Sequence, residues 1–139
     1  MTDPLTCLAI ALYFEARSES MIGQFAVAEV IMNRVEDGRF GDDVCAVITQ
    51  DRGAGDHDCQ FSFWCDGLPD VIDDQATYDS IRALAYDVIM LPNAPDVSYG
   101  ALYYHTTDVS PSWSRNLQVT MVEGNHIFFT DVLKIAANY

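Results

Sequence analysis

The feature that most constrains this chain is an almost entirely apolar run near its N-terminus, Leu5 to Phe14, which is followed directly by a carboxylate, Glu15. A helix that is hydrophobic on nearly all sides has to be buried among other elements. The run therefore predicts a central helix from about Pro4 to Arg17, with Thr2 or Asp3 near its N-cap. It is too short to cross a bilayer.

Glu15 would lie among hydrocarbon in such a helix, because its neighbours at helical spacing include Ala11 and Leu12. Desolvation raises the pKa of a carboxyl group, and a carboxyl that stays neutral near physiological pH can serve as a general acid. The competing interpretation is an ion pair inside the core, with Arg17 or Arg34 as the partner. The residues alone leave both interpretations open.

Length and composition indicate one folded domain, residues 1–139, and we expect a monomer. Half of the residues are hydrophobic, which argues against disorder even though the net charge is −14. Seven Lys and Arg face 21 Asp and Glu, so the surface would repel phosphate backbones and anionic membranes. Nucleic acid and membrane lipids are thereby disfavoured as partners.

The N-terminal residues do not resemble a secretory leader. Thr2, Asp3 and Pro4 form no basic region, and no cleavage site precedes the charged Glu15 and Arg17. We therefore expect no export signal in this sequence.

Four cysteines, at positions 7, 45, 59 and 65, allow two disulfides in three connectivities. Paired cysteines in a small domain fit an enzyme that works outside the cytosol. The alternative is a zinc site made by Cys59 and Cys65 with histidines, although neither CxxC nor paired-histidine spacing is present.

The rest of the chain reads as an α+β domain. Apolar residues at helical spacing predict helices from about Ile22 to Val35, Val44 to Gln50, and Asp73 or Asp74 to Pro92, with an exposed loop at 51–60. Residues 100–105 and 118–129 look extended, and the turn residues 123–125 predict a β-hairpin within the second segment. The final residues, 132–139, read as a short strand or a tail.

Carboxylate chemistry is the class that remains, since no nucleophile elbow, phosphate loop or dinucleotide motif is present. Glu15 and Glu19, one helical turn apart, could form a catalytic pair. The solvated alternative for Glu19 is favoured, because carboxylates near a helix end commonly face water. Rings and polar groups could surround Glu15 and stack against sugars, and the candidates for binding substrate are Glu19, Phe61, Ser62, Tyr104, His105, Trp113 and His126.

Several of these motifs, in order, resemble the spore cortex-lytic enzyme and cell wall hydrolase family. The blocks are CLAIALYFEAR, GQFAVAEVIMNRV, CQFSFWCDG, YYH with a nearby PSW, and GNHIFF. The resemblance covers about residues 7–129, and its first two blocks are the most specific. One position departs from the usual EARGE pattern, because Ser18 stands where the family has glycine.

The resemblance implies a small lysozyme-like domain, mainly helical with a C-terminal β-hairpin, that cleaves the glycan strands of peptidoglycan. It implies that Glu15 is the catalytic acid of a lytic transglycosylase acting between N-acetylmuramic acid and N-acetylglucosamine. It also implies that neither a metal nor an organic cofactor takes part.

A phage endolysin that reaches the wall through a holin-type lesion, or the separated catalytic domain of a bacterial enzyme, fits the expected absence of a leader. The alternatives are a hydrolytic muramidase that uses Glu15 with water, assisted by Glu19, and a non-catalytic glycan-binding module.

Overall fold

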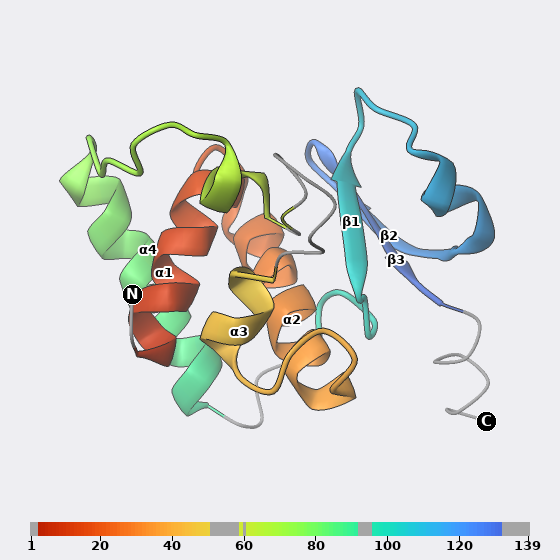
Figure 1. The fold of residues 1–139 in the computed structure, drawn as a ribbon, viewed down its shortest axis with the longest axis horizontal. Coiled ribbons are helices and arrows are strands. Elements are labelled where there is room, and N and C mark those ends of the chain that lie inside the picture. Colours follow the sequence, from red (N-terminus) through yellow and green to blue (C-terminus); the bar gives the residue numbers. More distant parts are fainter. Residues whose placement is uncertain (1–2, 51–58, 60, 92–95, 132–139) are drawn as a thin grey trace.

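The computed structural model describes residues 3–50, 59, 61–91 and 96–131. Figure 1 shows a helical part packed beside a small antiparallel sheet. This confirms an α+β fold that is mainly helical and ends in a β-hairpin. The elements are α1 (Pro4–Ala16), α2 (Met21–Asp37), α3 (Val44–Ile48), η1 (Ser62–Cys65), α4 (Gln75–Met90), β1 (Tyr103–Thr106), η2 (Ser112–Asn116), β2 (Gln118–Glu123) and β3 (His126–Thr130).

The helices begin where the sequence provides side-chain caps. Asp3 accepts a hydrogen bond from the backbone N–H of Thr6, and Asp43 and Asp74 cap α3 and α4 in the same way. Gly38 ends α2 in the left-handed conformation, with φ of 87°, as the sequence predicts. Because these signals are local, the predicted helix bounds differ from the observed ones by only one to two residues at most ends.

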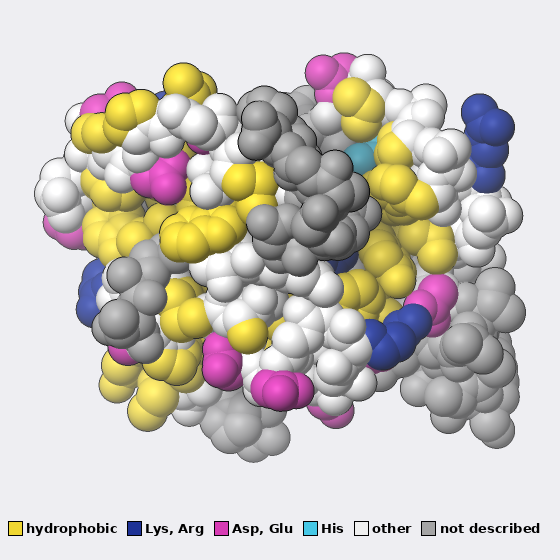
Figure 2. Space-filling view, in the orientation of Figure 1, with side chains coloured by type: hydrophobic (Ala, Val, Ile, Leu, Met, Phe, Trp, Pro, Cys, Tyr) yellow, Lys and Arg dark blue, Asp and Glu magenta, His cyan; other side chains and the backbone are white. Residues whose placement is uncertain are grey.

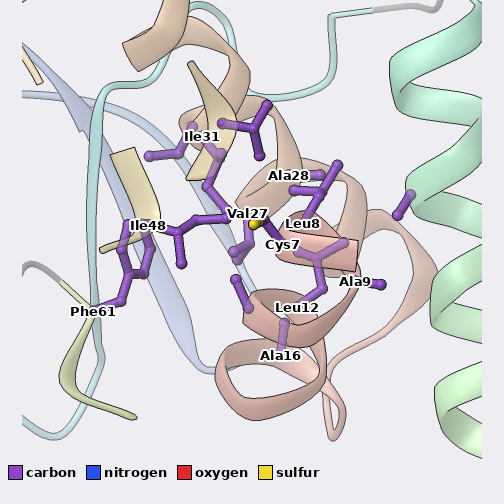
Figure 3. Close-up of a cluster of buried hydrophobic side chains, with 14 of the residues drawn as sticks. Cys7, Leu8, Ala9, Leu12, Ala16, Val27, Ala28, Ile31, Ile48 and Phe61 are labelled. Atoms are coloured by element: carbon purple, nitrogen blue, oxygen red, sulfur yellow. The ribbon is translucent and has the colours of Figure 1, made fainter. Parts of the chain in front are cut away.

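The helix α1 is central, and its side chains are buried on nearly every side. Cys7, Leu8 and Leu12 have no exposed surface. Figure 3 shows these residues packed against Val27, Ala28 and Ile31 of α2 and against Ile48 of α3, while α4 covers another side of α1 (Figure 1). The predicted buried helix is confirmed. Packing along the whole length of α1 fixes the position of its C-terminal end.

The sheet has three strands in the order β1-β3-β2, all antiparallel. The hairpin β2–β3 is the predicted one, with its turn at residues 123–125. The predicted extended segment at 100–105 supplies the third strand, β1, and the structure adds its pairing with β3, in which Tyr104 lies opposite Phe128 and Thr106 lies opposite His126. This pairing brings residues 103–106 to the middle of the molecule, beside the helices (Figure 1).

The four cysteines form two disulfides, in one of the three possible connectivities. Cys7 is bonded to Cys45, which joins α1 to α3, and Cys59 is bonded to Cys65, which closes a short loop around η1. Both sulfurs that a zinc site would need are therefore already bonded to each other, and the zinc hypothesis is wrong.

Two predicted segments fall largely outside the described residues: the exposed loop at 51–60, of which only Cys59 is described, and the last strand or tail at 132–139. None of the helices in the described ranges combines the length and the apolar character that a membrane span requires.

Candidate active site

Glu15 is the second-last residue of α1, at the end of the helix nearest the β2–β3 turn. Burial raises the pKa of its carboxyl group, and a hydrogen bond from Tyr104 partly opposes that rise. The partial negative charge at the C-terminus of a helix also disfavours the ionised form. In this site the carboxyl group of Glu15 therefore keeps its proton to a higher pH than it would in water.

The alternative interpretation, an ion pair between Glu15 and Arg17 or Arg34, is wrong. The Arg17 guanidinium instead contacts Asp73, with Nη1 2.9 Å from Oδ1. Arg34 donates from Nε to the carbonyl oxygen of Leu102 at 2.7 Å. In the part of the chain that the structure describes, Glu15 makes no ion pair.

Tyr104 is the polar partner of Glu15, since its hydroxyl donates to Glu15 Oε1 at 2.9 Å. Burial raises the pKa of Tyr104 well above its usual value, and the nearby Glu15 charge acts in the same direction. The phenol therefore stays protonated and remains a donor whether Glu15 is neutral or charged.

Glu15 lies between two pockets. The aromatic pocket, of about 140 Å³, is lined by Glu15, Arg34, Cys59, Phe61, Ser62 and Tyr104. The Cys59–Cys65 disulfide closes the loop that carries Phe61 and Ser62. Glu15 also lines the second pocket, so the same residue borders both.

Among the residues that the structure describes, those lining the polar pocket, of about 400 Å³, are all polar: Glu15, Ser18, Glu19, Thr106, Thr107, Asp108, Asn125 and His126. Hydroxyl, amide, carboxylate and imidazole groups are those that hydrogen-bond sugar hydroxyls and N-acetyl groups. Together the two pockets present rings on one side of Glu15 and hydrogen-bonding groups on the other.

The prediction of a solvated Glu19 on the same helical face as Glu15 is wrong. The helix α1 ends at Ala16, so the two residues are not one helical turn apart. The Glu19 side chain is only 4% exposed, and it accepts hydrogen bonds from the backbone N–H and the side-chain amide of Asn125 at 2.9 and 3.3 Å. Packing against the β2–β3 turn buries this carboxylate.

His126 lies beside both Glu19 and Tyr104. Its Nδ1 is 3.5 Å from Glu19 Oε1, and its ring meets the Tyr104 ring edge-on at 5.0 Å. Burial lowers the pKa of His126, and the Glu19 charge opposes that change. Among the described residues, Nδ1 makes no hydrogen bond.

His105 and Trp113, two of the predicted substrate-binding residues, do not join Glu15. Successive residues of a strand point to opposite faces, so His105 points away from the face on which Tyr104 meets Glu15. Its ring instead contacts Phe129 and Trp113, at 5.1 and 5.6 Å. Neither His105 nor Trp113 lines the two pockets that contain Glu15. On the face in Figure 2, hydrophobic side chains gather over the sheet as well as over the helices.

Some residues of the site were not predicted from the sequence. Arg34, which is 2% exposed and lies over the Phe40 ring at 4.5 Å, entered the prediction only as an ion-pair partner. Thr106, Asp108 and Asn125 carry no motif of their own, and they reach the polar pocket because β1 pairs with β3. The turn signal at 123–125 was the one sequence feature that pointed to Asn125.

Comparison with known proteins assigns the chain to a family. The model of the cell wall hydrolase family matches residues 18–129. The chain belongs to this family. It is 35% identical over 129 residues to the spore cortex-lytic enzyme of Halalkalibacterium halodurans and 36% identical over 129 residues to that of Oceanobacillus iheyensis. Both matches cover 91% of this chain but only 34% and 41% of the two relatives.

Two solved structures have the same fold. One is the catalytic domain of the germination-specific lytic transglycosylase SleB from Bacillus anthracis, with a TM-score of 0.70 and 28% identity over 94% of this chain and 96% of the other. The other is the catalytic domain of SleB from Bacillus cereus, with a TM-score of 0.71 and 30% identity over 91% and 89%. The chain thus corresponds in extent to the catalytic domains of those proteins. It spans less than half the length of the curated relatives that it matches.

Proposed function

We propose that this cell wall hydrolase is a lytic transglycosylase that cleaves peptidoglycan glycan strands between N-acetylmuramic acid and N-acetylglucosamine, with Glu15 as its general acid and base. The observation that carries the proposal is a partly buried carboxyl group with a raised pKa and a hydroxyl donor, which lines both an aromatic and a polar pocket. Membership of the cell wall hydrolase family and the SleB structures support the same reaction.

In this mechanism the neutral carboxyl of Glu15 gives its proton to the glycosidic oxygen as the bond to the muramyl anomeric carbon breaks. The resulting Glu15 carboxylate takes the proton of the muramyl 6-hydroxyl while that oxygen attacks the anomeric carbon. The product is a 1,6-anhydro sugar, and Glu15 is protonated again. The Tyr104 hydrogen bond stabilises the carboxylate in the middle of the cycle.

The pockets assign roles to the other predicted residues. We propose that Phe61, Ser62 and Tyr104 contact the sugar in the aromatic pocket, and that His126 lies along the sugar in the polar pocket, where Glu19 also forms part of the wall. A substrate-binding role for His105 and Trp113 stays a prediction, and it would require contacts on the other face of the sheet.

We also propose that residues 1–139 act as one catalytic domain and as a monomer, and that the enzyme meets its substrate in the periplasm or outside the cell. Size-exclusion chromatography with light scattering tests the oligomeric state. The phage endolysin interpretation, with release through a holin-type lesion, stays a prediction.

The test is a digest of purified sacculi with the wild type and with Glu15→Gln, analysed by mass spectrometry. Anhydro-muropeptides from the wild type, and none from the variant, are expected. Reducing ends would instead indicate a hydrolytic muramidase, and binding without any cleavage would indicate a glycan-binding module. A fully active Glu15→Gln variant would remove Glu15 from the mechanism.

A further inference from the structure

The segment that follows α1 is attached to the turn of the β2–β3 hairpin, more than a hundred residues away in the sequence. Glu19 Oε1 accepts from the backbone N–H of Asn125 at 2.9 Å, and Oε2 lies 3.3 Å from the Asn125 side-chain nitrogen. Next to this pair, Ser20 Oγ donates to Glu123 Oε1 at 3.1 Å. Three hydrogen bonds therefore join the segment between α1 and α2 to the β2–β3 hairpin.

The contact leaves no room for a Cβ atom at the turn unless the Glu19 carboxylate moves. Gly124 has φ of 56°, and a Cβ atom built on it would lie 2.8 Å from Glu19 Oε1. The left-handed glycines Gly38 and Gly67 differ, since nothing lies within 4 Å of a Cβ built on either. At Gly124, a side chain would both strain the backbone and push against the Glu19 carboxylate.

From this turn, direct contacts lead to Glu15. His126 follows Asn125 and meets the Tyr104 ring edge-on, and Tyr104 donates to Glu15. The carbonyl oxygen of Asn125 accepts from the backbone N–H of Thr107 at 2.8 Å, which fixes the segment after β1 as well. Residues from these segments and from the end of α1 together form the wall of the polar pocket.

We infer that Glu19 is a positioning residue, which holds the hairpin turn against the end of α1 and so fixes the polar pocket and Tyr104 relative to Glu15. The inference rests on the proposed function, since the geometry that it fixes is that of a sugar bound beside the acid. Both oxygens of Glu19 accept hydrogen bonds from Asn125, and Oε1 also lies 3.5 Å from Nδ1 of His126. The carboxylate is therefore engaged by the hairpin on both oxygens, and we assign it no role as a base that activates water or a hydroxyl group. A misplacement of about 1 Å can cost roughly 10²-fold in rate even when the change is outside the reacting groups.

Two substitutions of Glu19 separate positioning from proton transfer. In Glu19→Gln the amide oxygen still accepts from the Asn125 N–H, so we expect a kcat within about fivefold of wild type and an unchanged pH–rate profile, because a residue that transfers no proton contributes no limb to it. Glu19→Ala loses both bonds, and we expect its kcat to fall by up to about 10²-fold on soluble glycan strands, with a smaller change in KM.

Gly124 supplies an independent test with a matched control. Gly124→Ala should lower Tm more than Gly38→Ala does, because both introduce a strained φ but only the first adds a clash with Glu19. In the Glu19→Ala background the additional effect of Gly124→Ala should disappear. Circular dichroism of every variant establishes that it is folded before its kcat is compared.

The inference is overturned if a folded Glu19→Gln is as inactive as Glu19→Ala or loses a limb of its pH profile, since the carboxylate would then act in proton transfer. It is also overturned if Glu19→Ala keeps the wild-type kcat, or if Gly124→Ala is no worse than Gly38→Ala. Each of these outcomes counts only if the wild type is active and Glu15→Gln is inactive in the same assay. Absence of cleavage by the wild type is a failure of the proposed function instead.

Discussion

The two disulfides should contribute differently to stability and to activity. Cys7–Cys45 closes a segment of 38 residues, whereas Cys59–Cys65 closes one of only 6. In the chain-entropy model, a crosslink stabilises the fold by restricting the unfolded chain, and it does so more strongly when the closed segment is longer. The bond between α1 and α3 should therefore be the more important one for stability.

The magnitudes follow from the two separations. The model gives about 3.9 kcal/mol at 25 °C for the separation of 38 and about 2.2 kcal/mol for the separation of 6, a difference of about 1.6 kcal/mol. Replacing both cysteines of a pair by alanine also removes buried sulfur. Because Cys7 and Cys59 are both buried, that loss adds roughly 1 kcal/mol of cavity cost to each value and leaves their order unchanged.

Activity should respond in the opposite order. Cys59 lines the aromatic pocket, and its disulfide closes the loop that carries Phe61 and Ser62. The Cys59→Ala/Cys65→Ala variant should therefore lose activity per folded molecule, whereas Cys7→Ala/Cys45→Ala should retain it under conditions in which it is folded.

Urea unfolding followed by circular dichroism measures the first quantity, and release of muropeptides from sacculi at low temperature measures the second. If removal of Cys59–Cys65 costs as much unfolding free energy as removal of Cys7–Cys45, restriction of the unfolded chain is not the main contribution. If both variants keep equal activity per folded molecule, the short loop does not shape the pocket.

Three further predictions concern the charges of the site and of the surface. In Tyr104→Phe the hydrogen bond that lowers the pKa of Glu15 is lost, so the alkaline limb of the pH–rate profile should move to higher pH; an unmoved or lowered limb would contradict the pairing. Glu15→Gln should lower kcat by about 10²- to 10⁴-fold. It should also raise Tm relative to wild type, and the Tm difference should grow as pH rises. The reason is that a group whose pKa is raised in the folded state contributes its full stability below the pKa of the unfolded state and loses it as pH rises through the pKa of the folded state. A Tm difference that does not change with pH would refute this. With a net charge of −14, the enzyme should cleave anionic sacculi faster when salt is raised from roughly 20 to 200 mM, and turbidity assays that show a uniform decline would exclude repulsion as the cause.

The helical part of the fold was predictable because its signals are local. Asp3, Asp43 and Asp74 each cap a helix through a backbone N–H only three residues away, and Gly38 ends α2 at its own position. The buried character of α1 followed from its composition alone. None of these features depends on which distant segment packs against them.

The sheet was predicted only in part because strand pairing is not local. The turn residues at 123–125 predict a hairpin, but nothing in residues 103–106 states that they pair with β3. That pairing determines which face of β1 meets Glu15. Strand alternation already places Tyr104 and His105 on opposite faces, and the contact with α1 selects Tyr104 for the site.

The prediction that Glu19 is solvated was wrong because its contact with the hairpin is also not local. Its actual position bears on the mechanism. Its spacing from Glu15 matches one helical turn, but α1 ends before that turn is completed, and the carboxylate lies against Asn125 instead. A retaining or inverting hydrolase commonly uses two free carboxyl groups, one on each side of the bond that is cleaved. Glu19 is held by the hairpin, and Asp108 accepts a hydrogen bond from Thr106. Among the described residues, Glu15 is the carboxyl group of the polar pocket whose one hydrogen-bond partner is a phenol. This arrangement favours a reaction in which the substrate supplies its own nucleophile, because that reaction needs a single acid and base.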